Sequence, residues 1–307
     1  GISVAELVRA HLFGGFPWGM HVTAFVDHTF YQGAAWLGPH GLTLALLLLL
    51  VAPVSRLFGA FLVGGLAAFG LSEPVAAPEP AADAPLIRAV QPNAPQDEKW
   101  RADRIPVFLG RKFEATEAKP QAALVLWPEV SVPAWLDQAG DIIAEAARRG
   151  GGAEIILGAQ SFQANQAFNT LAHIRPDGQI AATYDKHHLV PFGEYMPLGN
   201  LFSRWGIYGL AARDGYGFAS GPGPELFEIP GFGPVQALIC YEGIFAHEVA
   251  RGLERPRLIT IHTNDAWFGQ WGGPAQHLAQ AKARAVAQGL HVARSANTGV
   301  TASNGAR

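Results

Sequence analysis

Residues 122–159 read AALVLWPEVSVPAWLDQAGDIIAEAARRGGGAEIILGA and set out the pattern on which the main domain is built. The segment begins with an apolar run at 122–127 and ends with another at 154–159, both of strand length. Between them, residues 134–149 have the pattern of an amphipathic helix. A strand, a helix and a further strand in this order are typical of a layered α/β domain.

The same alternation continues on both sides of this segment, so the globular part is expected to cover residues 87–307. Further strands are predicted at 87–91, 171–175, 180–185, 235–240, 258–263 and 291–296. Further helices are predicted at 97–109, 245–253 and 275–288. The turn residues Pro176-Asp-Gly-Gln179 predict a hairpin between the strands that flank them.

Composition excludes several classes of protein. The 307 residues are 49% hydrophobic and only 15% charged, which excludes a disordered chain. A net charge of −3 and a pI near 6.4 provide no basic footprint for nucleic acid. Cys240 is the one cysteine, so neither a disulfide framework nor a cysteine-based zinc site is expected.

Apolar residues are concentrated near the N-terminus. Residues 1–71 hold four of the 47 charged side chains, and residues 34–55 hold none. This run is long enough for a membrane-spanning helix, which needs roughly 20 apolar residues. A second run at 57–71 is Gly-rich and slightly short, so a second spanning helix would include Ser72. The prediction is a membrane region at 1–72 with helices at 34–55 and 57–72; a buried hairpin of a soluble protein is the alternative.

The orientation of this region is predicted from its flanking charges. Arg56 lies in the short turn between the two helices and places that turn on the cytoplasmic side. The C-terminal region would then lie on the opposite side of the membrane. Residues 73–86, rich in Pro and Ala, are predicted to be an extended linker.

Three polar residues follow apolar strand runs, where α/β sheets commonly carry reactive groups. Glu129 follows the run ending at Pro128, Lys186 follows the strand 180–185, and Cys240 follows residues 236–239. Taken singly, each has an ordinary structural interpretation: a solvated turn carboxylate, an exposed lysine and a small buried hydrophobe.

Together, these three residue types supply the parts of an acyl-transfer site. A cysteine attacks an acyl carbon as thiolate, so it needs a base or a nearby positive charge. Glu129 can take the thiol proton, and the Lys186 ammonium can stabilise the oxyanion of a tetrahedral intermediate. Spacing along the chain does not show whether they meet.

The motifs around these residues resemble the nitrilase superfamily and, more narrowly, its membrane-embedded apolipoprotein N-acyltransferase family. The similarity covers nearly the whole chain. It is carried by Gly14-Gly-Phe-Pro-Trp18, Trp127-Pro-Glu129, Lys186-His-His-Leu-Val-Pro-Phe-Gly-Glu-Tyr-Met-Pro197, Cys240-Tyr-Glu242, Thr263-Asn-Asp-Ala-Trp-Phe-Gly269, Gly273-Pro-Ala-Gln-His277 and Ala296-Asn-Thr-Gly-Val-Thr301.

The resemblance implies a nitrilase-like α-β-β-α sandwich preceded by transmembrane helices, with a Glu-Lys-Cys triad at Glu129, Lys186 and Cys240. It also assigns supporting or substrate-binding roles to four residues: Trp100, Glu194, Tyr241 and Glu242. Without the resemblance, Trp100 would be an ordinary packed aromatic and Glu194 a turn carboxylate. Asn264 and Asp265 are expected to support the pocket without taking part in the chemistry.

The implied reaction is a two-step acyl transfer with ping-pong kinetics. Cys240 would take an acyl chain from a phospholipid, usually phosphatidylethanolamine, and pass it to the N-terminal amine of a diacylglyceryl apolipoprotein. The family resemblance places the enzyme in the bacterial inner membrane as a multi-pass protein with its catalytic domain facing the periplasm. No metal, organic cofactor or nucleic acid is expected, and the protein is expected to be a monomer. The adjacent residues His187 and His188 are predicted to point to different faces of a strand, which argues against a metal site formed by both.

Two other functional interpretations remain open. A soluble nitrilase-type amidase would use the same triad on small amides, but the run at 34–55 and the pair Tyr241-Glu242 disfavour it. A non-catalytic binding module would be expected to lack at least one triad residue, and none is missing. The family has more membrane helices and continues beyond residue 307, so the chain resembles a fragment truncated at both ends.

Overall fold

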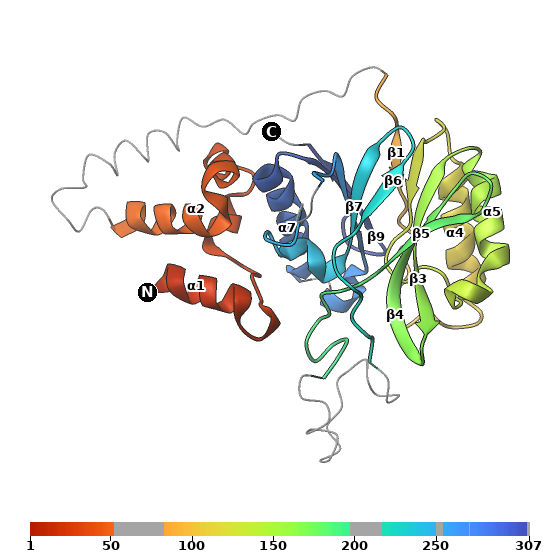
Figure 1. The fold of residues 1–307 in the computed structure, drawn as a ribbon, viewed down its shortest axis with the longest axis horizontal. Coiled ribbons are helices and arrows are strands. Elements are labelled where there is room, and N and C mark those ends of the chain that lie inside the picture. The colour runs from red at the N-terminus through yellow and green to blue at the C-terminus, as the bar shows by residue number, and fades with distance from the viewer. Residues whose placement is uncertain (52–82, 197–216, 250–253, 270, 306–307) are drawn as a thin grey trace, which may run out of the picture.

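Two five-stranded mixed β-sheets face each other in the computed structural model, which describes residues 1–51, 83–196, 217–249, 254–269 and 271–305 (Figure 1). The first sheet has the order β1-β2-β3-β4-β5, with β1 (Ile87–Ala89), β2 (Leu124–Leu126), β3 (Glu154–Gln163), β4 (Gln166–Ile174) and β5 (Ile180–Asp185). The second has the order β10-β9-β8-β7-β6, with β6 (Leu226–Ile229), β7 (Gly233–Ile239), β8 (Leu258–Thr263), β9 (His291–Ala296) and β10 (Ala302–Asn304).

Parallel pairing at the centre of each sheet aligns the strand ends that carry the site. Strand β2 pairs in parallel with β1 and β3, and β8 pairs in parallel with β7 and β9. The outer pairs β3–β4, β4–β5, β6–β7 and β9–β10 are antiparallel. Each sheet thus has a parallel core, as expected for strands joined by helical crossovers.

Helices cover the outer faces of both sheets, so the predicted α-β-β-α sandwich is confirmed (Figure 1). Helices α4 (Ile105–Glu117) and α5 (Gly140–Gly150) lie on the first sheet, and α7 (Gly273–Gln288) lies on the second. Apolar side chains also fill the space between the two sheets. There, Leu126 and Ile156 of the first sheet pack in one cluster with Ile239 of the second. Burial of these side chains is the main stabilising term of the domain.

Helix α5 shows why the local sequence forms the predicted element. Ile143, Ala146 and Ala147 are buried at helical spacing against the sheet. Asp141 in the first turn and two arginines in the last complement the helix dipole, and Gly151 ends the helix in the left-handed conformation.

Most predicted strands lie where the pattern placed them, but two helix predictions were wrong. The hairpin is confirmed: β4 and β5 flank the turn, in which Gly178 has a φ of +82°. Residues 97–104 form turns, and α4 begins at Ile105 because Pro106 occupies its first turn, where its missing N–H costs nothing. Residues 245–249 are not helical, and 250–253 lie outside the described residues.

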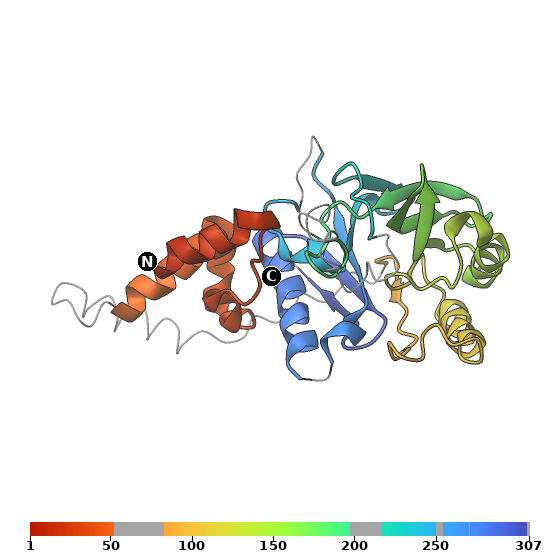
Figure 2. The same cartoon turned by 90° about the horizontal axis from the view of Figure 1, so that it is seen from below.

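The N-terminal residues form a separate layer beside α7 (Figures 1 and 2). Helix α1 (Ile2–His11) is followed by α2 (Ala34–Val51), which is kinked at Gly38, just before Pro39. Residues Thr29–Val51 have a mean hydropathy of 1.8 and are, by length and composition alone, able to cross a membrane. The predicted helix at 57–72 and most of the linker at 73–86 fall outside the described residues.

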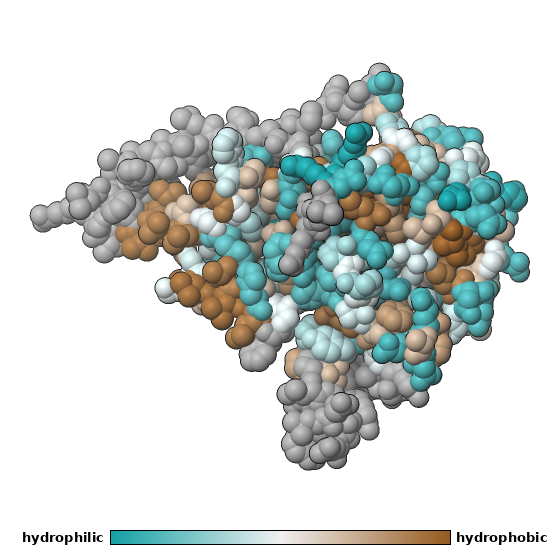
Figure 3. Space-filling model, in the orientation of Figure 1, coloured by the Kyte–Doolittle hydropathy of each residue, from teal (hydrophilic) through white to brown (hydrophobic). Residues whose placement is uncertain are grey.

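This N-terminal layer exposes apolar side chains. Brown atoms gather over α1 and α2 in Figure 3, and the exposed residues include Val4, Leu7, Leu12, Leu44, Leu48 and Leu50. An apolar surface of this kind marks a region that contacts protein or lipid.

Gly158 in β3 lies against the loop that carries Glu129. A Cβ atom there would come within 2.4 Å of the Pro128 carbonyl oxygen and 2.9 Å of Glu129 Cα. The Gly158 carbonyl accepts hydrogen bonds from the Ser131 and Val132 amides, at 2.8 and 3.1 Å. The loop therefore follows a path that only glycine in β3 allows.

We predict that Gly158→Ala lowers the free energy of unfolding by about 1–3 kcal/mol, because the added methyl group must displace the loop backbone. Urea unfolding in detergent micelles would measure the change. Gly110→Ala in α4 is the matched control: no atom lies within 4 Å of its added methyl group. This control should leave stability unchanged or raise it by up to about 1 kcal/mol. Equal losses for both variants would contradict the prediction.

Candidate active site

Glu129, Lys186 and Cys240 line one cavity of about 580 Å³. Glu129 follows β2, Lys186 follows β5 and Cys240 follows β7, so the two sheets bring three distant parts of the chain to the same edge. The described structure brings these three residues to one cavity, which their spacing along the chain did not predict. Of the four supporting residues, Trp100, Glu194 and Tyr241 also line the cavity, whereas Glu242 lies behind it.

Lys186 is a fully buried cation held between two carboxylates. Its Nζ atom lies 2.8 Å from Glu194 Oε1 and 3.5 Å from Glu129 Oε1. Burial alone would disfavour the charged amine, but the two carboxylates outweigh it and raise the pKa of Lys186 above its ordinary value. The charged form of the side chain is therefore favoured.

The Glu129 carboxylate is fixed by donors on both oxygens. Asn169 Nδ2 donates to Oε1 at 2.8 Å, and the Asn264 backbone amide donates to Oε2 at 2.9 Å. Asn169 also lies 3.5 Å from Glu194 Oε1, so one amide orients both acidic residues. Sequence analysis missed Asn169, since a single polar residue within strand β4 carries no motif of its own.

Cys240 lies at a strained turn between a strand and a 3₁₀ helix. It begins η8 (Cys240–Ile244) immediately after β7, with a φ of +49°. Positive φ is unfavourable for a residue with a side chain and is often found at functional sites. A sharp strand-to-helix turn of this type presents the nucleophilic serine of α/β-hydrolases.

The thiol of Cys240 is protonated in the resting site. Burial and the negative charge of Glu129 raise the pKa of Cys240 above its ordinary value, and the opposing effect of Lys186 is smaller. The side chain therefore needs a base to become a nucleophile.

Glu242 is fully buried and joins the cysteine turn to the lysine loop. Its Oε2 accepts from the Ile239 amide at 2.8 Å, one residue before Cys240. Its Oε1 accepts from the Tyr184 hydroxyl at 2.6 Å and the His187 amide at 2.9 Å, on either side of Lys186. This carboxylate therefore fixes the relative positions of the cysteine and the lysine.

Tyr241 and Trp100 both line the cavity and have different contacts. The Tyr241 hydroxyl donates to the Gly15 carbonyl at 2.8 Å, which ties the site to the N-terminal layer. Trp100 is 45% exposed and its ring lies 4.9 Å from Lys99 Nζ. The indole is therefore free to contact a bound molecule.

The expectation that His187 and His188 point to different faces of a strand is wrong. Both follow the end of β5, and both contact Glu248, at 3.1 and 2.7 Å. The three residues have the composition of a metal site, with ligand atoms within 4.8 Å of one another. Their other ring nitrogens face Glu242 and the Gly14 carbonyl, so the group already forms an ion-pair network.

These ion pairs shift the pKa values of their members in opposite directions. Burial alone would lower the pKa of His187, but hydrogen bonds to Glu242 and Glu248 raise it to about 9. Burial would raise the pKa of Glu248, but the two histidines lower it to about 2. A charged network of this kind stabilises the loop that follows Lys186.

Asp265 is the centre of a second buried network. Its carboxylate accepts from Arg294 Nη2 at 2.8 and 2.7 Å and lies 2.9 Å from His277 Nδ1. His277 Nε2 in turn lies 3.3 Å from the carbonyl oxygen of Cys240. Asp265 thus supports the pocket, as expected, while the contribution of His277 was missed although its motif had been noted.

Aromatic side chains form much of the remaining wall of the cavity. Two come from the N-terminal layer and two from the segment after β8: Phe16, Trp18, Trp267 and Phe268. Charged chemistry at one end and an apolar wall at the other suit a substrate with an acyl chain.

Comparison with known proteins gives two family matches that together account for most of the chain. The carbon-nitrogen hydrolase family matches residues 86–306, and the apolipoprotein N-acyltransferase N-terminal domain matches residues 2–71.

Curated relatives are similar over nearly all of this chain. The apolipoprotein N-acyltransferases of Rhodopseudomonas palustris and Sinorhizobium fredii are 35% and 33% identical to it, over 98% of its length. The alignments cover 62% and 61% of those proteins, so the chain spans about three fifths of their length.

Solved structures with similar folds are more distant in sequence. A CN-hydrolase superfamily protein from Xanthomonas campestris has a TM-score of 0.45 and 23% identity, over 70% of this chain and 76% of its own. An amidase of the nitrilase superfamily from Nesterenkonia has a TM-score of 0.48 and 18% identity, over 71% and 78%. Since the first family match spans more than half of the chain, the chain belongs to the carbon-nitrogen hydrolase family.

Proposed function

We propose that this chain carries the catalytic site of an apolipoprotein N-acyltransferase. In this proposal, an acyl chain passes from a phospholipid to Cys240 and then to the N-terminal amine of a diacylglyceryl apolipoprotein. The observation that carries the proposal is the buried set of Glu129, Lys186 and Cys240 in a cavity partly walled by the N-terminal layer. The names of the curated relatives support the same reaction.

In the first step, the Cys240 sulfur attacks the ester carbonyl of the donor while Glu129 takes the thiol proton. The raised pKa of Cys240 makes this proton transfer necessary, and the fixed carboxylate is the base available for it. The Lys186 ammonium stabilises the oxyanion. Collapse of the intermediate breaks the ester C–O bond, and Glu129 returns the proton to the leaving glycerol oxygen, so that lysophospholipid departs.

In the second step, the α-amine of the acceptor attacks the thioester carbonyl and Glu129 takes a proton from the nitrogen. The C–S bond breaks, and Cys240 leaves as thiolate and is reprotonated. Side chains handle every proton and charge in both steps, so the proposed reaction requires neither a metal nor an organic cofactor.

The supporting residues act through the three chemical groups or on the substrate. Glu194 pairs with Lys186 together with Glu129, and Glu242 positions the cysteine turn. Tyr241 joins that turn to the N-terminal layer, and Trp100 contacts the bound lipid.

The location follows from the substrates. Both are lipids, so we place the protein in the bacterial inner membrane as a multi-pass monomer, with residues 1–72 in the bilayer, a linker at 73–86, and residues 87–307 as the catalytic domain on the periplasmic side. The apolar helix Thr29–Val51 and the exposed apolar side chains of α1 and α2 support this placement.

We predict that the full chain, purified in detergent and given phosphatidylethanolamine, gains the mass of one acyl chain. Neutral hydroxylamine should remove the added mass, because it cleaves thioesters. Intact-mass spectrometry would measure both changes. Cys240→Ser keeps the size of the side chain and should show no hydroxylamine-sensitive adduct.

Phosphatidylethanolamine with an unreactive ether link at sn-1 is a second control. Failure of the wild-type chain to acquire an acyl group, together with release of ammonia from small amides, would replace the proposal with amide hydrolysis.

We also predict that Glu242→Gln slows thioester formation by at least about tenfold and costs about 1–3 kcal/mol of stability. Four donors converge on the two oxygens of this carboxylate. In the glutamine variant, an NH2 group replaces one of these oxygens, so that donors face a donor. Intact-mass spectrometry of samples quenched at successive times would measure the rate, and urea unfolding would measure the stability. Glu228→Gln, an exposed change in β6, is the matched control and should alter neither. An unchanged rate in Glu242→Gln would contradict the positioning role.

A further inference from the structure

Lys99 is a buried cation that no carboxylate neutralises. Its side chain is enclosed, with the residue only 7% exposed, yet within the described ranges it forms no ion pair. Its Nζ atom donates a long hydrogen bond of 3.4 Å to the Glu129 backbone carbonyl and lies over the Trp100 ring. Burial lowers the pKa of Lys99 to about 8, against the attraction of Glu129, so the amine is mostly charged at neutral pH.

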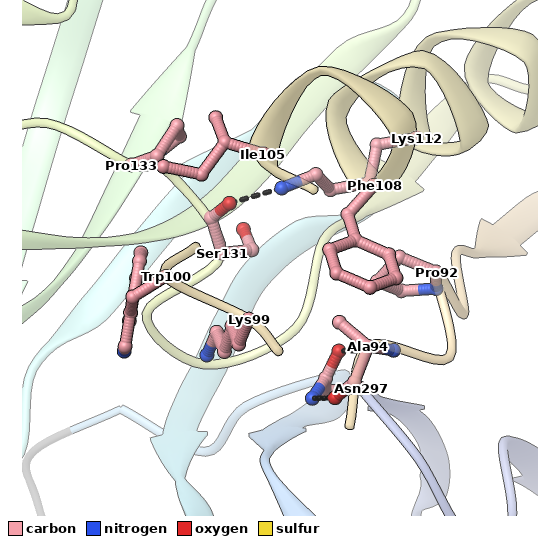
Figure 4. Close-up of a pocket in the computed structure, with 10 residues that line it drawn as sticks. All are labelled: Pro92, Ala94, Lys99, Trp100, Ile105, Phe108, Lys112, Ser131, Pro133 and Asn297. Atoms are coloured by element: carbon pink, nitrogen blue, oxygen red, sulfur yellow. Dashed lines mark hydrogen bonds between the residues drawn. The ribbon is translucent and has the colours of Figure 1, made fainter. Parts of the chain in front are cut away.

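The neighbouring Lys112 has a structural role that Lys99 lacks. It extends from α4 to the backbone carbonyl of Ser131, and Figure 4 shows this hydrogen bond, with Lys99 and Trp100 lying on the other side of the small pocket. Burial and the nearby charge of Lys99 lower the pKa of Lys112 to about 7. Lys112 borders only this small pocket, whereas Lys99 also borders the cavity that holds Cys240.

The charges that line the catalytic cavity sum to zero but are unevenly paired. Two lysines, Lys99 and Lys186, border it, and no arginine does among the described residues. The two carboxylates of the lining, Glu129 and Glu194, both pair with Lys186. Among the described lining residues, Lys99 is thus a cation without an ion-pair partner, and a buried charge without such a partner is costly unless a ligand supplies one.

We propose that the Lys99 ammonium binds the phosphate group of the acyl donor. This inference rests on the proposed function, in which a phospholipid ester reacts with Cys240. Only the glycerol unit separates that ester from the phosphodiester, so an anion near Lys99 and an ester at Cys240 belong to one molecule. Lysine is a common point-charge ligand for phosphate. Trp100, beside Lys99 and half exposed, covers the glycerol side of the headgroup.

The test compares donors with and without phosphate. Thioester formation would be followed by intact mass at increasing concentrations of phosphatidylethanolamine and, separately, of p-nitrophenyl palmitate, which has an ester but no phosphate. Lys99→Met should raise the half-saturating concentration of phosphatidylethanolamine by at least about tenfold and leave that of the palmitate ester unchanged. Lys99→Arg keeps the charge and should restore most of the affinity.

Lys112→Met is the matched control, because it removes a buried lysine charge that does not face the catalytic cavity. It should affect both donors equally. Equal effects of Lys99→Met on the two donors, or no effect on either, would overturn the inference.

A binding measurement keeps the test independent of turnover. In the Cys240→Ala variant, native mass spectrometry should show that phosphatidylethanolamine binds more tightly than diacylglycerol. Adding Lys99→Met should abolish this difference in affinity. Should the wild-type chain form no thioester while this preference persists, the proposed reaction fails and the phosphate site stands. Should thioester form but the preference be absent, the phosphate site fails alone.

Competition separates the two sources of phosphate. Glycerophosphoethanolamine should compete with phosphatidylethanolamine in the wild-type chain and lose its effect in Lys99→Met. Inorganic phosphate at the same concentration should compete far less, because it lacks the glycerol and ethanolamine contacts. Equal competition by inorganic phosphate would identify a general anion site and overturn the assignment to the donor.

Discussion

The buried ammonium of Lys186 is the constraint around which the rest of the site is arranged. A charge removed from water is tolerated only when opposite charges and hydrogen bonds replace its hydration. Glu129 and Glu194 supply these from two loops, and Asn169 joins the two carboxylates. Because each of these residues follows or belongs to a strand of the first sheet, the burial of this charge depends on that sheet.

A second constraint connects this charged centre to the other sheet. Cys240 is held in an unfavourable backbone conformation, and the surrounding structure must supply the free energy that keeps it there. Glu242 holds the residue before it, and His277 lies against its carbonyl oxygen. The two sheets are thus joined by polar contacts at the edge that carries the site and by apolar contacts between their faces.

The sequence predicted the fold better than it predicted the interactions within the site. Strand positions such as those of β5 and β8 followed from short apolar runs, because burial on a sheet face leaves a clear local pattern. Helix α4 was placed too early, since the decisive signal was the proline in its first turn and not the charged residues before it. The positive φ of Cys240 and the convergence of His187 and His188 on Glu248 depend on distant segments, and no local pattern records them.

The two cavity lysines differ in how their buried charges are paired. Lys186 and Lys99 are both enclosed, but burial is compensated only for Lys186, whose pKa rises, while that of Lys99 falls. The sequence alone did not indicate a role for Lys99, because no local pattern shows that its side chain is buried without an ion-pair partner.

The N-terminal layer contributes to the site and also leads into the apolar helix α2. Phe16 and Trp18 form part of the cavity wall, and the Gly15 carbonyl accepts the hydrogen bond of Tyr241, the residue after the nucleophile. A soluble amidase would have no need for a wall built from a segment that leads into an apolar helix. A substrate whose acyl chain extends toward the bilayer does need one, because the chain must stay out of water from the membrane to the cysteine. The same segment that leads into the apolar helix therefore also completes the cavity.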